Sequence, residues 1–498
     1  MMLTDGRRSS RILSTLVAVL CALFLMSCEN ALEKSAESLR SGAVLAHASP
    51  SGLHAEEANH QVRLDWDKVD GATSYTLYWS TAPITTLVEA NAVSLTTNYY
   101  THTGLQNGKA LYYSVAAHGF DAESQVSKCI VALPHQYMAY VTNGGVSGSE
   151  CNAVGYTLNG EDGSLVELGG YSFDVGSYPK KIVTDPSRRF AYISSFNNQK
   201  ITCYKIDSDT GRLVPIGSPV SAGSGVSSLA VDPSGKYLYA VNSTNNFPNG
   251  NSVSAYAIDQ STGSLSSISG SPFAAGSYPN GIAIDPTGRF VYVPANDGGS
   301  GTNIGVFSIS GSGALAKSSD IVAGAGVCGI AIHPKGKFLY PTFWNGATDA
   351  AVQALTLNTT DGLLLGGQVT RTYNILPRAP GNFAEVVEID PTGRFLYVCL
   401  YSKTKIAIYS IDQTSGDLTP LSGSPFQLWP ATPAEIPNAI GFDPEGKFAF
   451  IVTALADTPY TGALRCFSID QESGGLSAVG SPRTLGKNSC DIEIISLP

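Results

Sequence analysis

Short hydrophobic runs separated by turn-forming residues recur along the chain from about residue 50 to its end. Typical examples are the apolar run Gly281–Ile284 and the aromatic run Phe290–Val293. Most of the 52 Gly and 27 Pro residues fall between such runs, where they favour turns. Few stretches show helical periodicity beyond the first forty or so residues. The pattern therefore predicts an all-β chain of many short strands.

One unit of this pattern repeats from residue 137 onward. Each unit has a short apolar strand, an Asp-Pro or His-Pro pair, a turn, an aromatic strand and two further strands. A proline after Asp suits the first corner of a tight turn, whose free N–H groups the Asp side chain can bind. The pairs lie 47, 53, 48, 57 and 53 residues apart, at Asp185, Asp232, Asp285, His333, Asp390 and Asp443. Four strands in about 50 residues are typical of a β-propeller blade.

The two ends of this region complete one more blade. Residues 138–143 match the second strand of the unit, 155–158 the third, and 162–165 open the fourth. The missing first strand is supplied by Cys490–Ile495 at the far end of the chain. Residues 137–498 are therefore predicted to form a seven-bladed propeller, closed by pairing of its N- and C-terminal strands.

A smaller domain precedes the propeller, over residues 51–134. Leu64–Trp66, Tyr75–Trp79 and Leu111–Ala117 alternate as strands of a seven-strand sandwich, with Trp66 placed to fill its core. Their spacing resembles a fibronectin type III domain, although Leu111 stands where that family usually has a tyrosine. Such modules usually act as spacers or bind partners, so no chemistry is assigned to this domain.

The N-terminus has the features of an export signal. Arg7, Arg8 and Arg11 precede the apolar stretch Ile12–Met26, which has the length of a signal-peptide core. The stretch ends in Leu-Met-Ser-Cys28, which resembles a bacterial lipobox, whose cysteine is lipidated. We therefore expect a signal peptide over 1–27, lipid on Cys28 and a tether over 28–50; the alternative is a plain secretory signal. Glu29, by analogy with lipoprotein sorting, favours the outer membrane.

Charge and cysteine content narrow the function classes. The net charge is −10 and no Lys/Arg cluster follows the signal, so nucleic acid is not expected as a partner. The seven cysteines after Cys28 are odd in number and contain no C-x-x-C, which indicates neither a disulfide framework nor a zinc site. We expect them to be small buried hydrophobic residues. No metal and no cofactor is predicted.

The repeat region, residues 137–498, resembles the seven-bladed propeller lactonases, which include a 6-phosphogluconolactonase type. It also resembles bacterial surface propellers with a Tyr-Val-Thr-Asn signature, present here at residues 140–143. In the lactonases a Pro-Arg-His sequence in one blade is implicated in lactone chemistry. No blade of this chain contains it, and the nearest match is Pro179-Lys180-Lys181.

The repeat also predicts which residues meet at the central channel, because the first strand of each blade lines it. Five residues before each turn Asp, the seven blades carry Lys180, Ser227, Asn280, Cys328, Glu385, Asn438 and Cys490. One residue later they carry Lys181, Ser228, Gly281, Gly329, Val386, Ala439 and Asp491. Side chains alternate between the faces of a strand, so one ring is expected to face the channel more directly.

Candidate chemistry follows from these two rings. The catalytic candidates are Lys180, Lys181 and Glu385, and the binding candidates are Lys180, Ser227, Asn280, Glu385, Asn438 and Asp491. Burial could lower the pKa of a lysine enough for it to act as a base. The alternative is that Lys180 and Glu385 form a structural ion pair or a hydrated channel lining. His333 replaces a turn Asp, which favours a turn role over catalysis.

Two hypotheses remain at this stage. The first is an exported lipoprotein, anchored through Cys28 and monomeric, whose propeller binds a protein or carbohydrate ligand as a scaffold. The second is a lactone hydrolase, which rests on the resemblance of the whole propeller to the lactonases. The missing Pro-Arg-His favours the first, since a fold alone does not specify an activity.

Overall fold

The computed structural model describes most of the chain after residue 48. The described residues are 49–119, 124–145, 151–173, 175–243, 251–295, 303–323, 326–343, 350–365, 371–376, 383–401, 404–427, 435–455 and 461–497. They fall into two compact units, divided between Gln136 and Tyr137. The predicted signal peptide, Cys28 and most of the tether lie outside the described residues. Within the described residues, no helix has the length and apolar character needed to cross a membrane.

The first unit contains two antiparallel sheets over a shared hydrophobic core. One sheet is ordered β1 (His54–Ala58), β2 (Gln61–Asp65), β5 (Tyr99–Thr103). The other is ordered β4 (Asn91–Leu95), β3 (Ser74–Ser80), β6 (Leu111–His118), β7 (Ile130–Ala132), and a 3-10 turn covers Leu87–Glu89. Leu64, Leu77 and Val115 are fully buried in this core, and Trp66 fills it as predicted. Membership of the fibronectin type III family stays a prediction.

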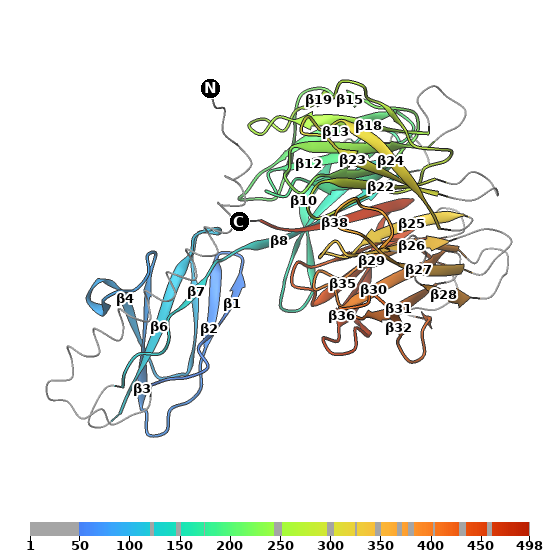
Figure 1. The fold of residues 1–498 in the computed structure, drawn as a ribbon. Coiled ribbons are helices and arrows are strands. Elements are labelled where there is room, and N and C mark those ends of the chain that lie inside the picture. Colours follow the sequence, from blue (N-terminus) through green and yellow to red (C-terminus); the bar gives the residue numbers. More distant parts are fainter. Residues whose placement is uncertain are drawn as a thin grey trace, which may run out of the picture. The chain divides into compact units, whose positions relative to one another are not determined.

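The second unit consists of seven antiparallel sheets, which are the blades of the propeller (Figure 1). Blades 1 to 3 contain β11 (Pro179–Thr184), β12 (Phe190–Ser195), β13 (Lys200–Ile206), β14 (Leu213–Pro215) and β15 (Val220–Ser221); β16 (Val226–Val231), β17 (Tyr237–Asn242), β18 (Ser252–Ile258), β19 (Leu265–Ser267) and β20 (Phe273–Ala274); and β21 (Ala283–Ile284), β22 (Phe290–Ala295), β23 (Asn303–Ile309) and β24 (Leu315–Val322). Blades 4 and 5 contain β25 (Val327–Ile332), β26 (Phe338–Phe343), β27 (Ala350–Thr356) and β28 (Arg371–Leu376); and β29 (Phe383–Ile389), β30 (Phe395–Tyr401), β31 (Lys405–Ile411), β32 (Leu418–Pro420) and β33 (Phe426–Gln427). Blades 6 and 7 contain β34 (Glu435–Phe442), β35 (Phe448–Leu455), β36 (Thr461–Ile469) and β37 (Leu476–Lys487); and β38 (Ser489–Leu497), β8 (Gln136–Asn143), β9 (Asn152–Leu158) and β10 (Leu165–Phe173).

The seventh blade closes the ring as the sequence predicts. Its sheet is ordered β10-β9-β8-β38, so the C-terminal strand pairs with the first strand of the propeller. In Figure 1 the red strand β38 lies beside the blue-green strand β8. We call the first strand of each blade its inner strand, and for blade 7 this is β38. Because β38 pairs with β8, the N-terminal strand of the propeller has a hydrogen-bonded partner on this side and is not an open sheet edge.

The repeated Asp residues cap the turns between first and second strands. In blade 1, Oδ1 of Asp185 accepts hydrogen bonds from the backbone N–H groups of Arg189 and Phe190, both at 2.7 Å. Its other oxygen accepts from the N–H of Ser187 at 3.3 Å. In blade 4 His333 caps the equivalent turn, since its Nδ1 accepts a hydrogen bond from the N–H of Lys335 at 3.1 Å. The predicted turn role of His333 is confirmed.

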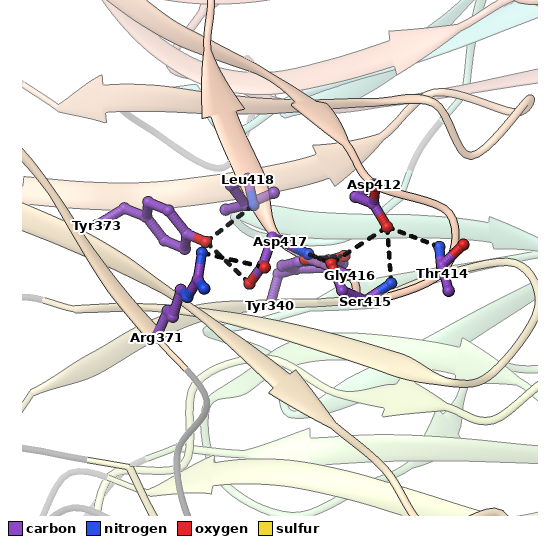
Figure 2. Close-up of polar contacts among 9 residues, drawn as sticks. All are labelled: Tyr340, Arg371, Tyr373, Asp412, Thr414, Ser415, Gly416, Asp417 and Leu418. Carbon is purple, nitrogen blue, oxygen red and sulfur yellow. Dashed lines mark hydrogen bonds and ion pairs between the residues drawn. The ribbon is translucent and has the colours of Figure 1, made fainter.

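A buried tyrosine joins most blades to the next one. Its hydroxyl donates to the carbonyl of a turn glycine in the following blade, at 2.7 to 3.0 Å, in the pairs Tyr140–Gly211, Tyr192–Gly263, Tyr239–Gly313, Tyr292–Gly362, Tyr340–Gly416 and Tyr397–Gly474. Figure 2 shows the pair Tyr340–Gly416, in a turn that Asp412 caps by accepting from the N–H of Ser415. In blade 6, Phe450 stands at the tyrosine position and has no hydroxyl to donate. We call the junction between two neighbouring blades a seam. At the seam between blades 6 and 7, Tyr137 instead donates to Glu445 at 2.8 Å.

Candidate functional site

A β-bulge interrupts the inner strands at the channel-lining positions. In blade 2, Val226 pairs with Asn242 and Ser228 with Val241, so Ser227 has no partner across the ladder. The same shift passes over Cys328, Glu385 and Asn438 in blades 4, 5 and 6, and it lies between Pro179 and Ile182 in blade 1. A bulge places two consecutive residues opposite one, so side chains do not alternate strictly between the faces at these positions of blades 1, 2, 4, 5 and 6. Which of the two rings faces the channel more directly stays a prediction. Bulges of this kind re-aim side chains and are common beside active sites.

Two of the predicted binding residues, Asn438 and Ser227, contact the backbone. Asn438 donates to the carbonyl of Ser489 at 2.8 Å, which ties blade 6 to blade 7. Ser227 makes a long contact of 3.5 Å with the carbonyl of Val241. Asn280 is exposed, just before the short inner strand of blade 3. The hydrogen bond of Asn438 gives that side chain a structural role.

Lys180 and Glu385 are not brought together by anything that the structure describes. The ammonium of Lys180 lies over the ring of Tyr178, 5.2 Å from its centre. Glu385 belongs to β29, but its side chain lies outside the described part of the chain. The ion pair between them stays a prediction.

Lys181 and Asp491 do meet, and they join the first and last inner strands. Nζ of Lys181 lies 3.0 Å from Oδ1 of Asp491, while Oδ2 of Asp491 accepts from the N–H of Ile182 at 2.9 Å. The side chain of Asp491 is 6% exposed and that of Lys181 is 30% exposed. Asp491 is thus held on both oxygens, while the side chain of Lys181 stays partly exposed.

Two further carboxylates belong to the same cluster. Glu493, on β38, accepts hydrogen bonds from the N–H and hydroxyl of Thr184, at 3.2 and 2.7 Å. Glu388, on β29, interacts electrostatically with Lys181, Asp491 and Glu493. Blade 5 is not a neighbour of blade 1 or blade 7, so Glu388 reaches this group across the central channel. No other described residue hydrogen-bonds to its half-buried carboxylate.

Sequence reasoning missed Glu388 and Glu493, although a signal was present. Both stand two residues before the turn position, where the other five blades carry small or apolar residues: Val183, Ala230, Ala283, Ala331 and Gly441. An acidic side chain at a position that is otherwise apolar in a repeat marks it for attention.

Comparison with known proteins decides the family. The lactonase family of seven-bladed β-propellers matches residues 154–329 and 303–494. The chain belongs to this family. No curated protein matches it.

Solved structures of similar fold extend over the propeller at low identity. A putative 6-phosphogluconolactonase from Bacteroides uniformis is 18% identical, with a TM-score of 0.58, and the match covers 72% of this chain and 99% of that one. A similar protein from Bacteroides fragilis is also 18% identical, with a TM-score of 0.55, covering 72% and 98%. The periplasmic gluconolactonase of Pseudomonas aeruginosa is 17% identical, with a TM-score of 0.55, covering 73% and 100%. At these identities the likeness shows the fold alone.

In this lactonase-family channel, the neighbouring charged groups and burial shift the pKa values of one lysine and of two glutamates. Burial alone would lower the pKa of Lys181, but Asp491, Glu388 and Glu493 outweigh it, so the pKa lies above its ordinary value. Lys181 therefore stays charged at neutral pH, which does not suit a general base. The reason is the surrounding negative charge, which opposes the effect of burial.

The glutamates have the opposite character. Burial raises the pKa of Glu388 to about 7, with Asp491 and Glu493 adding to the rise and Lys181 opposing it. Burial likewise raises the pKa of Glu493 to about 7, against the hydrogen bond from Thr184. A carboxylate with a pKa near 7 suits proton transfer at neutral pH. No group of three or more His, Cys, Asp or Glu among the described residues is arranged to hold a metal ion.

Proposed function

We propose that the propeller hydrolyses a lactone, with Glu388 as the general base. The observation that carries this proposal is the position of Glu388, a carboxylate with a pKa of about 7 that faces the Lys181 ammonium across the channel. A positioned general base and a fixed positive charge both accelerate ester hydrolysis. Family membership supports the same reaction class.

In the proposed reaction Glu388 transfers the proton and Lys181 stabilises the negative charge. Glu388 takes a proton from water, and the water oxygen bonds to the lactone carbonyl carbon. The positive charge of Lys181 stabilises the negative oxygen of the tetrahedral intermediate. The bond between that carbon and the ring oxygen then breaks, and the proton on Glu388 passes to the departing oxygen. The product is the hydroxy acid, with one water consumed.

Asp491 and Glu493 are positioning residues in this scheme. Asp491 holds Lys181 through the 3.0 Å ion pair and is itself fixed by the N–H of Ile182. Oε1 of Glu493 accepts both hydrogen bonds from Thr184, which holds that carboxylate in place and makes this oxygen less available for proton transfer. The contrast between a tethered and an untethered glutamate assigns the base to Glu388.

A screen of sugar-acid lactones against the purified full chain tests the proposal. Glu388→Gln keeps the shape but removes the base, and we expect kcat/KM to fall by a factor of about 10² to 10⁴. Glu472→Gln, at an exposed turn of blade 6, is the matched control and should keep wild-type activity. Wild-type protein that turns over no lactone in the screen would contradict the hydrolase.

A binding scaffold is the second candidate. The chain has no Pro-Arg-His, and the only histidine in residues 137–498, His333, is committed to a turn. Under this alternative the channel or blade edges would take a protein or carbohydrate ligand. This alternative gains support if the wild-type protein hydrolyses no lactone in the screen.

We also propose that the protein is exported and anchored in the outer membrane by lipid on Cys28, with the first unit serving as a fibronectin-type spacer. The N-terminal pattern of basic, apolar and Cys-terminated segments supports the anchor. Cys28→Ser should move the protein from the membrane fraction to the soluble fraction. Wild-type protein found in the soluble fraction would contradict the anchor.

A further inference from the structure

We propose that the lactone taken by this channel is an uncharged polyhydroxy lactone without a phosphate group. This inference rests on the proposed hydrolase and concerns the same site.

The charged groups of the cluster are mostly negative. One ammonium, on Lys181, faces the carboxylates of Asp491, Glu388 and Glu493. The ion pair with Asp491 already compensates the lysine at 3.0 Å. Even with one glutamate protonated, the four groups together carry a net negative charge.

Cations near the mouth end of the inner strands have partners as well. At the start of β34, Glu435 binds Arg465 through both carboxylate oxygens, at 2.9 and 2.7 Å. The ammonium of Lys180 lies against the Tyr178 ring. Ser227, Cys328 and Asn438 are uncharged. Among the described residues, each of these two cations is thus already in contact with another side chain.

The net negative charge of this cluster would weaken the binding of a phosphate dianion. Phosphate sites normally present arginine, lysine or a group of backbone N–H donors. Repulsion between a single charge of the phosphate and one uncompensated carboxylate charge roughly 8 Å away, in surroundings of effective dielectric about 20, corresponds to a factor of about 30 in binding, and the second charge of the dianion adds to it. Like-charge repulsion of this kind is a recognised source of specificity.

Hydroxyl groups, in contrast, match what the cluster offers. An ionised carboxylate can only accept hydrogen bonds, so the ligand must bring donors. The Glu388 carboxylate has no hydrogen bond from another described residue and is half-buried, which leaves it able to receive one. The hydroxyls of a sugar-acid lactone supply such donors without adding charge.

Three substrates test the inference with the full chain: D-glucono-δ-lactone, its 6-phosphate, and its 6-acetyl ester as a neutral group at the same position. We expect kcat/KM to be at least about 30-fold higher for the unphosphorylated lactone than for the phosphate. The acetyl ester should behave like the parent lactone, and the discrimination should shrink at 0.5 M salt because screening weakens repulsion between charges. Equal or faster hydrolysis of the phosphate overturns the substrate inference and leaves the hydrolase standing.

A binding measurement keeps the two proposals separable. If no lactone is hydrolysed, the hydrolase fails, and calorimetric titration with glucose and glucose 6-phosphate still tests the charge argument. Weaker binding of the phosphate supports a channel that excludes anions. Tighter binding of the phosphate overturns it.

Discussion

The hydroxyl of Tyr397 donates a 2.8 Å hydrogen bond to the carbonyl of Gly474 and so joins blade 5 to blade 6. The tyrosine is fully buried, so no water can replace it as the donor. Tyr397→Phe should lower the free energy of unfolding by about 1–3 kcal/mol, because a buried carbonyl loses its partner. Urea denaturation measures this change. Tyr278→Phe is the control, since Tyr278 is 51% exposed, and equal effects of the two substitutions would contradict a role for the seam.

We expect substitution of the turn glycines at these seams to lower the free energy of unfolding. Two glycines distinguish backbone strain from overpacking as the cause. Gly263 has a φ of +76°, and a Cβ there would lie 2.3 Å from Cδ1 of Phe190 in the preceding blade. Gly217 has a φ of +58° with no atom within 4 Å of such a Cβ. Gly217→Ala should cost about 1–2 kcal/mol from backbone strain alone. Gly263→Ala should cost a further 1–3 kcal/mol or so from overpacking, and equal losses in denaturation would contradict the contact.

The repeat made most of this architecture predictable. The spacing of the Asp-Pro pairs placed the blades, and the apolar run Cys490–Ile495 correctly predicted the closing strand, which the structure extends to Ser489–Leu497. His333 was predictable as a turn residue because its place in the unit was known. Each of these features depends on local sequence and on the period.

The chemistry of the channel was less predictable, because it depends on relations between blades. The bulge is a shift in hydrogen-bond register, and no residue type in the inner strands predicts it. The pKa of Lys181 depends on Glu388, which is 207 positions away and belongs to a blade across the channel. Counting residues back from each turn Asp located Asp491 and Lys181, but it did not reveal which groups meet.

The glutamates predict an unusual dependence of stability on pH. The pKa values of Glu388 and Glu493 are about 4.5 in the unfolded chain and about 7 in the folded one. Between these values the folded state retains protons that the unfolded state has released, so the contribution of the two glutamates to stability is greatest below pH 4.5 and is lost as pH rises through 7. Glu388→Gln should flatten part of this slope in urea titrations from pH 5 to 8. An unchanged slope in that variant would argue against a buried, protonated Glu388.

His333 predicts a slope of the opposite sign. Burial lowers its pKa, and its Nδ1 accepts the N–H of Lys335 while its Nε2 contacts the carbonyl of Gly393 at 2.9 Å, which fixes the neutral ring. The unfolded chain therefore takes up a proton first as pH falls below 6.5, and stability decreases there. His333→Asp, which restores the turn residue of the other blades, should remove this decrease between pH 6.5 and 5. Denaturation curves that are equally pH-dependent in both proteins would contradict it.

The pH dependence of kcat/KM for an uncharged sugar-acid lactone, corrected for spontaneous hydrolysis, tests the central claim most directly. With Glu388 as the base, the rate should rise with pH to a plateau, with a midpoint near 7. Glu388→Gln should abolish both the rise and most of the activity. A flat profile, or a Glu388→Gln protein with the wild-type rate and midpoint, would contradict the account.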